Sequence, residues 1–82
     1  LKQRRAELLG SANGDLVVGS LTRRESEVAL LAASGARNRE IADRLQISVR
    51  TAETHLHRAM GKLGCAARED LAMYQAELAA RI

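Results

Sequence analysis

The most informative segment of the sequence is Arg39-Glu40-Ile41-Ala42-Asp43-Arg44-Leu45-Gln46-Ile47-Ser48-Val49-Arg50-Thr51-Ala52. Its first part predicts a short helix whose buried side holds Ile41, Ala42 and Leu45. A three-residue turn follows, and Ser48 then stands where an N-cap residue would start a second helix. The outward side of that second helix is polar and basic. This arrangement is typical of a helix-turn-helix, in which the second helix enters the major groove of DNA.

Further helices are predicted on both sides of this motif. Upstream, Thr22 and Glu25 have the spacing of a capping box, and Gly35 is expected to end the helix that they start. The second helix of the motif is predicted from about Val49 to Leu63. A fourth helix is predicted over 67–80, after a reversal at the intervening glycine. The apolar residues expected to face inwards are Val28, Leu31, Ala32, Ala52, Leu56, Ala59, Met60, Leu63, Leu71, Tyr74, Leu78 and Ile82.

No strand pattern of useful length appears in the sequence. We therefore predict an all-α fold, a compact four-helix helix-turn-helix domain over 21–82. Residues 1–9 contain good helix formers and predict an extra N-terminal helix, and 11–15 have the composition of a turn or linker. Residues 1–20 are interpreted as a linker or the end of an upstream region. Because the chain begins with Leu1, we expect it to be a fragment of a longer protein.

Composition excludes several classes of protein. The 82 residues suffice for one small domain. A single cysteine cannot form an internal disulfide, which indicates a reducing compartment. Tyr74 is the one aromatic residue, which argues against modules that stack single-stranded bases on aromatic rings. No apolar run approaches the roughly 18 residues needed to cross a membrane.

The positive charge of the chain is concentrated in one segment. From Ser48 to Arg68, four Lys or Arg residues accompany Glu53 alone, and this difference equals the net charge of +3 of the whole chain. A surface of one sign on a predicted recognition helix favours contact with phosphates.

Catalytic and metal sites are not expected. His55 and His57 lie two positions apart, on different sides of a helix, whereas a metal pair needs a spacing of three or four. Cys65 is interpreted as a small, partly buried apolar residue, with redox sensing as the alternative. No phosphate loop, nucleophile with a base, or paired carboxylates occur, so we expect no enzyme activity and no cofactor.

Two flanking segments make the pattern more specific. They are Leu21-Thr22-Arg23-Arg24-Glu25 and Lys62-Leu63-Gly64-Cys65-Ala66-Ala67-Arg68. With the central stretch they resemble the C-terminal DNA-binding domain of LuxR-type transcription regulators, also called the NarL/FixJ class, over residues 21 to about 80. The resemblance implies sequence-specific binding of double-stranded DNA in the bacterial cytosol or nucleoid, with the helix from about Val49 to Leu63 in the major groove.

The resemblance also implies individual contacts. The base-contact candidates are Glu53, Thr54 and His57. The phosphate-contact candidates are Asn38, Arg39, Ser48, Arg50, Thr51, Arg58 and Lys62.

Three positions depart from the pattern of the family. Lys or Arg is usual at Glu53, where a carboxylate could accept a hydrogen bond from a cytosine amino group or instead stay solvated or pair with a neighbouring side chain. Ser or Thr is usual at Arg37 and Ala67, so two helix caps are missing, although Glu40 and Asp70 keep the acidic halves of the boxes. Each lost cap is expected to destabilise the domain by about 0.5–2 kcal/mol. Asn38 is the expected replacement for the first cap.

One domain of this size covers a half-site, so two copies on a roughly palindromic operator are expected. In LuxR-type domains the fourth helix forms the dimer, and the corresponding interface candidates are Met73, Tyr74 and Glu77. The alternative is that the apolar residues of this helix only close the core of the monomer. RNA polymerase is a further candidate partner.

Two other functions remain open from the sequence. Region 4 of a sigma factor shares the Leu-Thr-x-Arg-Glu start but usually lacks the downstream segment and the fourth helix. A helical interaction module that no longer binds DNA would explain Glu53 and the missing caps.

Overall fold

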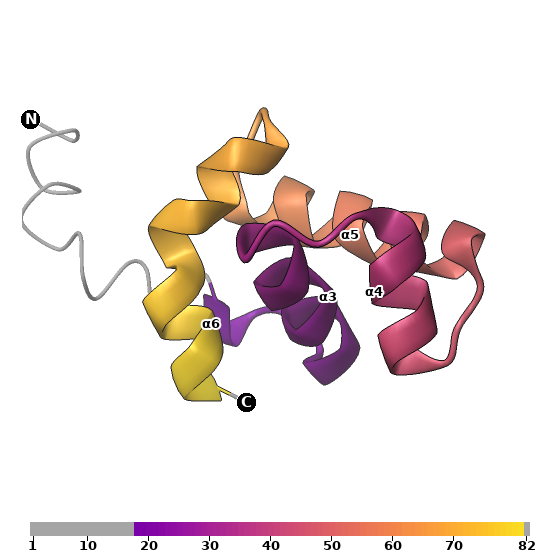
Figure 1. The fold of residues 1–82 in the computed structure, drawn as a ribbon. Helices are drawn as coiled ribbons and strands as arrows, with labels where there is room; N and C mark the ends of the chain where they lie inside the picture. Colours follow the sequence, from indigo (N-terminus) through magenta and orange to yellow (C-terminus); the bar gives the residue numbers. More distant parts are fainter. Residues whose placement is uncertain (1–17, 82) are drawn as a thin grey trace, which may run out of the picture.

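A computed structural model describes residues 18–81. The predicted all-α helix-turn-helix fold is confirmed, and no strand occurs within this range. The helix expected over 1–9, the linker expected over 11–15 and the inward side chain expected at Ile82 lie outside the described residues. The elements are α3 (Arg23–Ala33), α4 (Asn38–Leu45), α5 (Val49–Leu63), the 3-10 helix η1 (Arg68–Tyr74) and α6 (Gln75–Arg81) (Figure 1).

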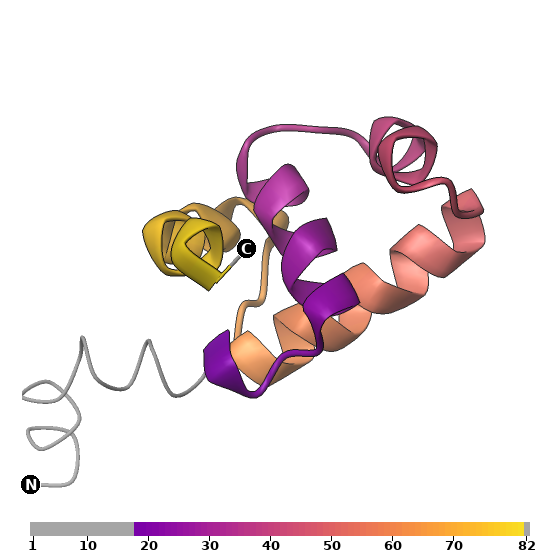
Figure 2. The ribbon, with the colours of Figure 1, turned by 90° about the horizontal axis from the view of Figure 1, so that it is seen from below.

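Helix α3 is the centre of the fold. It crosses α5, with α4 on one side and the η1–α6 segment on the other (Figures 1 and 2). Ala29, Ala52 and Ala59 are fully buried, and side chains this small allow two helices to lie close together. The buried core is one cluster made of Val18, Leu21, Val28, Ala29, Ala32, Ile41, Ala42, Ala52, Leu56, Ala59, Leu63, Leu71 and Leu78.

The predicted capping box at the start of α3 is confirmed. The Glu25 amide donates to Thr22 Oγ1 over 3.1 Å, and the Thr22 amide donates to Glu25 Oε1 over 2.9 Å. Two amides that an isolated helix end would leave without an acceptor are thereby satisfied. Ser34 is the C-cap, and Gly35 follows with a φ of 98°, a left-handed conformation that favours glycine.

The turn of the helix-turn-helix consists of Gln46, Ile47 and Ser48. Gln46 is the C-cap of α4 and adopts a φ of 60°, and the Ile47 amide donates to the Ala42 carbonyl over 3.0 Å. Ser48 caps α5 as expected, because its side chain accepts from the Thr51 amide. The bounds of α5, Val49–Leu63, agree with the prediction.

The prediction of one continuous helix over 67–80 is wrong. The chain forms η1 first and becomes α-helical only from Gln75. Arg68, Leu71 and Tyr74 are spaced by three, the repeat of a 3-10 helix, so all three lie on one inward face. The spacing of four from Tyr74 to the buried Leu78 then suits an α-helix.

A partly buried ion pair joins the start of α3 to the last turn of α5. The Lys62 ammonium lies 2.8 Å from Glu25 Oε1, and the two side chains are 39% and 4% exposed. Lys62 also donates to the Ser20 carbonyl over 3.2 Å. Burial raises the pKa of Glu25, but the hydrogen bonds from Lys62 and Thr22 and the charge of Lys62 outweigh it, so the pKa lies below its ordinary value. The structure therefore gives Lys62 a role in the fold, while its expected phosphate contact stays a prediction.

Hydrogen bonds from Arg81 fix the C-terminal end of α6 to the rest of the domain. Arg81 Nε donates to Ser26 Oγ over 2.9 Å, and a terminal nitrogen of the same guanidinium donates to the Leu21 carbonyl. Ser26 is fully buried, so its hydroxyl gains a partner that water could not supply.

No helix within 18–81 combines the length and the apolar character needed to span a membrane.

The Glu25–Lys62 pair generates the first prediction. Lys62→Met keeps most of the side-chain volume but leaves the Glu25 carboxylate buried without its cation. Because Lys62 is partly exposed, we expect a loss of about 2 kcal/mol in the free energy of unfolding at pH 7, below the value for a fully buried pair. Arg58→Met, at an exposed position without a partner among residues 18–81, should change it by about 0.5 kcal/mol or less.

The pH dependence gives a second measure of the same pair. A carboxyl whose folded-state pKa is lowered stabilises the fold above its unfolded pKa of about 4.3, and this contribution is lost as the pH falls through the folded pKa. Urea unfolding of the wild type and Lys62→Met should therefore give free energies that converge towards pH 3. A difference that stays constant from pH 7 to pH 3 would contradict this role of Glu25.

Candidate nucleic-acid interface

The outward side of α5 forms one continuous polar surface. Its side chains line an open hollow of about 360 Å³. The opposite side of the same helix is fixed in the core by Ala52, Leu56, Ala59 and Leu63. The position of the whole surface is thus set by the packing of α5 on α3. It brings together the three base-contact candidates and two phosphate-contact candidates, namely Glu53, Thr54, His57, Arg50 and Arg58.

The hydrogen-bonding capacity of this surface differs from residue to residue. The Thr54 hydroxyl donates to the Arg50 carbonyl over 3.0 Å, so its proton is used within the helix and its methyl group and lone pair remain available. Glu53 is exposed and has neither a hydrogen-bond nor an ion-pair partner among residues 18–81. The pairing with Arg50 or His57 that the sequence left open is not observed.

The start of α5 is suited to an anion. Ser48 Oγ accepts from the Thr51 amide over 2.9 Å and donates to Thr51 Oγ1 over 2.8 Å. The proton of Ser48 is therefore committed to the cap, while the hydroxyl proton of Thr51 remains free to donate outwards. The positive end of the helix dipole adds a favourable potential for a phosphate at this place.

The start of α4 is also suited to an anion, because its first amides lack a side-chain cap. Arg37 is the N-cap, and its amide donates to Glu40 Oε1 over 2.7 Å, but its side chain offers no acceptor to the helix. The first amides of α4 are consequently left for an outside acceptor. The expectation that Asn38 replaces the missing cap is wrong, since Asn38 is the first residue of the helix itself.

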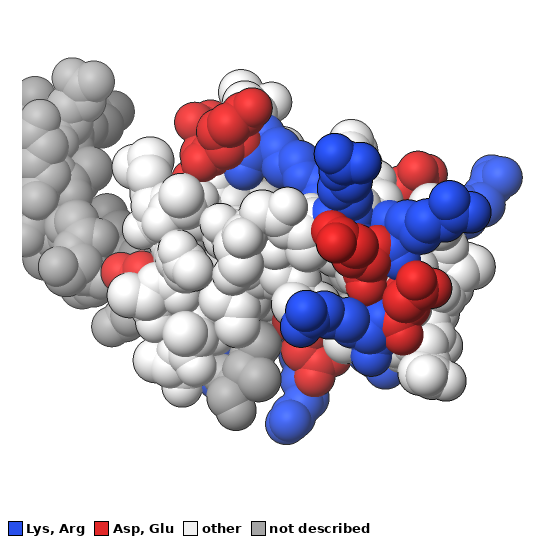
Figure 3. Space-filling model, in the orientation of Figure 1, with Lys and Arg blue, Asp and Glu red and all other residues white. Residues whose placement is uncertain are grey.

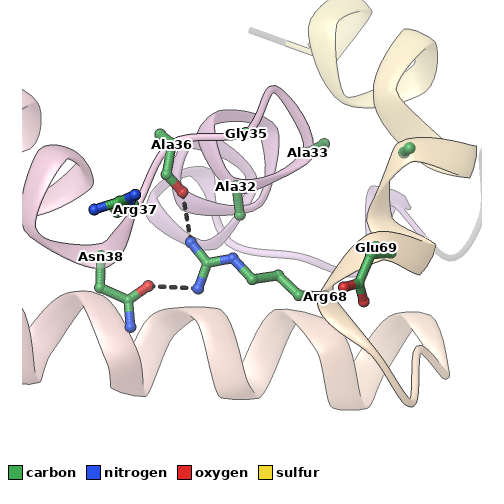
Figure 4. A pocket seen from close by; sticks show the side chains of 9 residues that line it. Ala32, Ala33, Gly35, Ala36, Arg37, Asn38, Arg68 and Glu69 are labelled. Atoms are coloured by element: carbon green, nitrogen blue, oxygen red, sulfur yellow. Dashed lines mark hydrogen bonds between the residues drawn. The ribbon is translucent and has the colours of Figure 1, made fainter.

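The side chain of Asn38 is instead held by Arg68 (Figure 4). One terminal guanidinium nitrogen of Arg68 donates to Asn38 Oδ1 over 2.7 Å, and the other donates to the Ala36 carbonyl over 2.6 Å. These bonds cross an open pocket of about 530 Å³ between the end of α3, the start of α4 and η1. Because its oxygen is occupied, Asn38 has its amide hydrogens free, and these can donate to a phosphate.

This role of Arg68 was not predicted from the sequence, in which Arg68 belongs to the positively charged segment that ends at this residue. In the structure its side chain is half-buried, and its partner Asn38 lies 30 positions away along the chain. The one available signal was the spacing of three that places Arg68 on the inward side of η1.

Fewer cations are therefore free on this surface than the sequence suggested. Lys62 is paired with Glu25 and Arg68 binds internal oxygens, so Arg50 and Arg58 remain on α5 and Arg39 on α4. Charged side chains of both signs gather over α4 and its surroundings, and acidic side chains gather over the start of η1, while the surface over the rest of η1 and α6 shows few charges (Figure 3).

The dimer-interface candidates lie on the η1–α6 segment. Met73 is 76% exposed, whereas Leu71 and Leu78 are fully buried. Tyr74 is half-buried, and its hydroxyl donates to the Leu63 carbonyl over 3.4 Å. Glu77 is also half-buried. Met73 thus offers the largest free apolar side chain of the three.

The residues examined for metal or redox chemistry are separated. His57 is exposed and His55 is half-buried, with a buried Nδ1 that has no partner within the described residues. Burial, and then the charge of Asp70, raise the pKa of Cys65, which lowers its thiolate fraction and agrees with an apolar packing role. Residues 18–81 contain no group of three or more His, Cys, Asp or Glu side chains placed to hold a metal ion.

Comparison with known proteins agrees with this geometry. The family described as "Bacterial regulatory proteins, luxR family" matches residues 19–75. The transcriptional regulatory protein LiaR of Bacillus subtilis is 40% identical over 55 residues, which are 67% of this chain and 26% of that protein. The oxygen regulatory protein NreC of Staphylococcus aureus is 43% identical over 54 residues, 66% of this chain and 25% of that protein.

A protein of Mycobacterium bovis named as an HTH-type transcriptional regulator is 47% identical over 53 residues, 65% of this chain and 6% of that protein. The chain therefore spans about a quarter or less of the length of these relatives. No solved structure gives a significant match.

The pair of hydrogen bonds from the Arg68 guanidinium to Asn38 and Ala36 generates a prediction. Arg68→Ala should lower the free energy of unfolding by about 1–3 kcal/mol, because two hydrogen bonds from a charged donor are lost. Arg68→Lys keeps the charge but cannot make both bonds in one plane, so it should recover less than half of that loss. Thermal and urea unfolding followed by circular dichroism measure both effects. If Arg68→Lys is as stable as the wild type, the positive charge stabilises the domain and the pair of hydrogen bonds does not.

Proposed function

Because the chain belongs to the luxR family of bacterial regulatory proteins, whose members are DNA-binding transcription regulators and not enzymes, we propose that 21–82 bind double-stranded DNA sequence-specifically as the effector domain of such a regulator. The observation that carries the proposal is the exposed polar side of α5 beside the uncapped, basic start of α4. Residues 1–20 would then link this domain to an upstream regulatory region, and the protein would act in the bacterial cytosol or on the nucleoid.

In this proposal α5 lies in the major groove and α4 lies across its edge. Glu53, Thr54 and His57 face the base pairs from the middle of α5. Phosphates on the two sides of the groove are contacted from both helices. The proposed phosphate contacts are Arg50, Thr51 and Arg58 of α5 and Asn38 and Arg39 of α4. Ser48 and Lys62 remain phosphate-contact candidates at exposed positions, although their side chains also bond within the domain.

The competing functions make different predictions. A sigma-factor region would copurify with core RNA polymerase, and the family match to luxR-type regulators disfavours it. RNA polymerase remains a candidate partner of a bound activator. A helical interaction module without DNA binding would show no steep dependence of binding on salt.

Salt dependence tests the phosphate contacts. Arg50→Ala and Arg39→Ala should each weaken binding about equally on all DNA sequences. The slope of log Kd against log salt concentration should fall in magnitude by about one for each lost contact. Arg23→Ala removes an exposed charge from α3 and serves as the matched control, with an unchanged slope. Fluorescence anisotropy at several salt concentrations measures the slopes, and equal slopes for all four proteins would remove Arg50 and Arg39 from the interface.

We further propose that two copies bind together on a roughly palindromic operator. One recognition helix offers few side chains to the bases, so a single domain distinguishes too few base pairs for a genome. The weakly charged surface over the rest of η1 and α6 is the candidate contact between the copies (Figure 3). It contains the exposed Met73 and the half-buried Tyr74 and Glu77. Its side chains are mainly small, since Ala72, Ala76, Ala79 and Ala80 are exposed here. We therefore expect a weak interface that forms mainly on DNA.

Cooperativity tests this surface. Met73→Glu places a charge in the proposed contact, so it should abolish cooperative binding to an operator with two half-sites. Helical content and affinity for one half-site should stay nearly unchanged because Met73 is 76% exposed. Met73→Leu is the apolar control and should remain cooperative. Cooperative binding by Met73→Glu would place the dimer contact on another surface.

A further inference from the structure

Glu53 is the one acidic residue of α5, and it stands in the middle of the side that faces away from the core. Arg50 precedes it by three positions and His57 follows it by four, the spacings at which helical side chains meet. Glu53 nevertheless has no partner among the described residues. Both carboxylate oxygens therefore remain available to a ligand on the surface.

A carboxylate is an unusual group for a surface that approaches DNA. It repels phosphates, so it lowers the affinity for every DNA sequence. It can only accept hydrogen bonds. In the major groove, guanine presents two acceptors and thymine presents one acceptor and a methyl group, so both would leave the carboxylate without a donor. Adenine presents a donor directly beside an acceptor, whereas cytosine presents its N4 amino group as a donor alone.

Resting on the proposed binding of α5 in the major groove, we propose that Glu53 determines specificity by accepting a hydrogen bond from the N4 amino group of a cytosine. Each half-site then contains a C·G pair opposite the middle of α5. The role is separate from that of Thr54, whose hydroxyl proton is bound to the Arg50 carbonyl and which suits contact with a thymine methyl group.

This assignment has a consequence for affinity that a solvated side chain would not have. Removing the carboxylate abolishes a favourable contact with one base and at the same time removes a repulsion from all phosphates. Glu53→Ala should therefore bind the preferred site more weakly and bind unrelated DNA about two- to five-fold more tightly at low salt. The two affinities change in opposite directions.

Selection from random duplexes identifies the position first. The wild type should return a half-site with one strongly preferred C·G pair that Glu53→Ala no longer prefers, while the other positions of the motif persist. Glu53→Gln should prefer A·T at the same position, because a carboxamide both donates to N7 and accepts from the N6 amino group of adenine. His57→Ala is the matched control from the same surface and should retain the preference for C·G.

A cycle of protein and DNA changes then isolates the hydrogen bond. Replacing the cytosine by pyrimidin-2-one, which lacks the N4 amino group, should weaken binding of the wild type about 5- to 150-fold and that of Glu53→Ala less than two-fold. Equal losses for both proteins, or an unchanged motif for Glu53→Ala, overturn the role of Glu53 while DNA binding itself stands. A wild type that selects no motif and binds without salt dependence overturns the proposed function. Because Glu53 is exposed and unpaired, the variants should keep the circular dichroism spectrum of the wild type, which separates these outcomes from unfolding.

Discussion

The ion pair between Glu25 and Lys62 is the interaction on which the rest of this domain depends. It joins the first turn of α3 to the last turn of α5 over 2.8 Å, and the same carboxylate closes the capping box of α3. The core itself is small and contains many alanines, so apolar burial contributes little per residue. Hydrogen bonds and the ion pair at the ends of the helices therefore help to set how α5 lies on α3. Arg81 adds a further tie through Ser26 and the Leu21 carbonyl.

Six of the positive residues within 18–81 consequently have two different kinds of role. Lys62, Arg68 and Arg81 bind acceptors within the domain, while Arg39, Arg50 and Arg58 remain exposed on the surface formed by α4 and α5. Arg68 connects the two parts of the molecule, because it belongs to η1 but holds Asn38 at the start of α4. The Arg68 guanidinium thus connects two proposed surfaces. One is the η1–α6 surface proposed for pairing of two copies, and the other is the surface of α4 and α5 proposed for DNA.

Much of the fold could be predicted because its signals are local. The Ser48 cap and the apolar stripe gave the bounds of α5, and the spacing of Thr22 and Glu25 gave the start of α3. The roles of individual cations could not be predicted in the same way. Lys62 and Glu25 are 37 positions apart, and Arg68 and Asn38 are 30 apart, so only the packed structure shows that they meet. The prediction of one continuous fourth helix was wrong for a related reason. The 3-10 helix at its start depends on Arg68 facing inwards, and only the packed structure shows this. For Glu53 the sequence left open a base contact, a solvated carboxylate and pairing with a neighbouring side chain, and no such pairing occurs within residues 18–81.

We propose that the outward side of α5 and the start of α4 form one DNA-binding surface. It is tested most directly by titrating the ¹⁵N-labelled chain with a duplex that holds one half-site and following the backbone amide signals. We predict that the largest shifts occur at residues 38–40 and 49–58, with little change over η1 and α6. Large shifts confined to η1 and α6, or an absence of shifts on α5, would contradict the account.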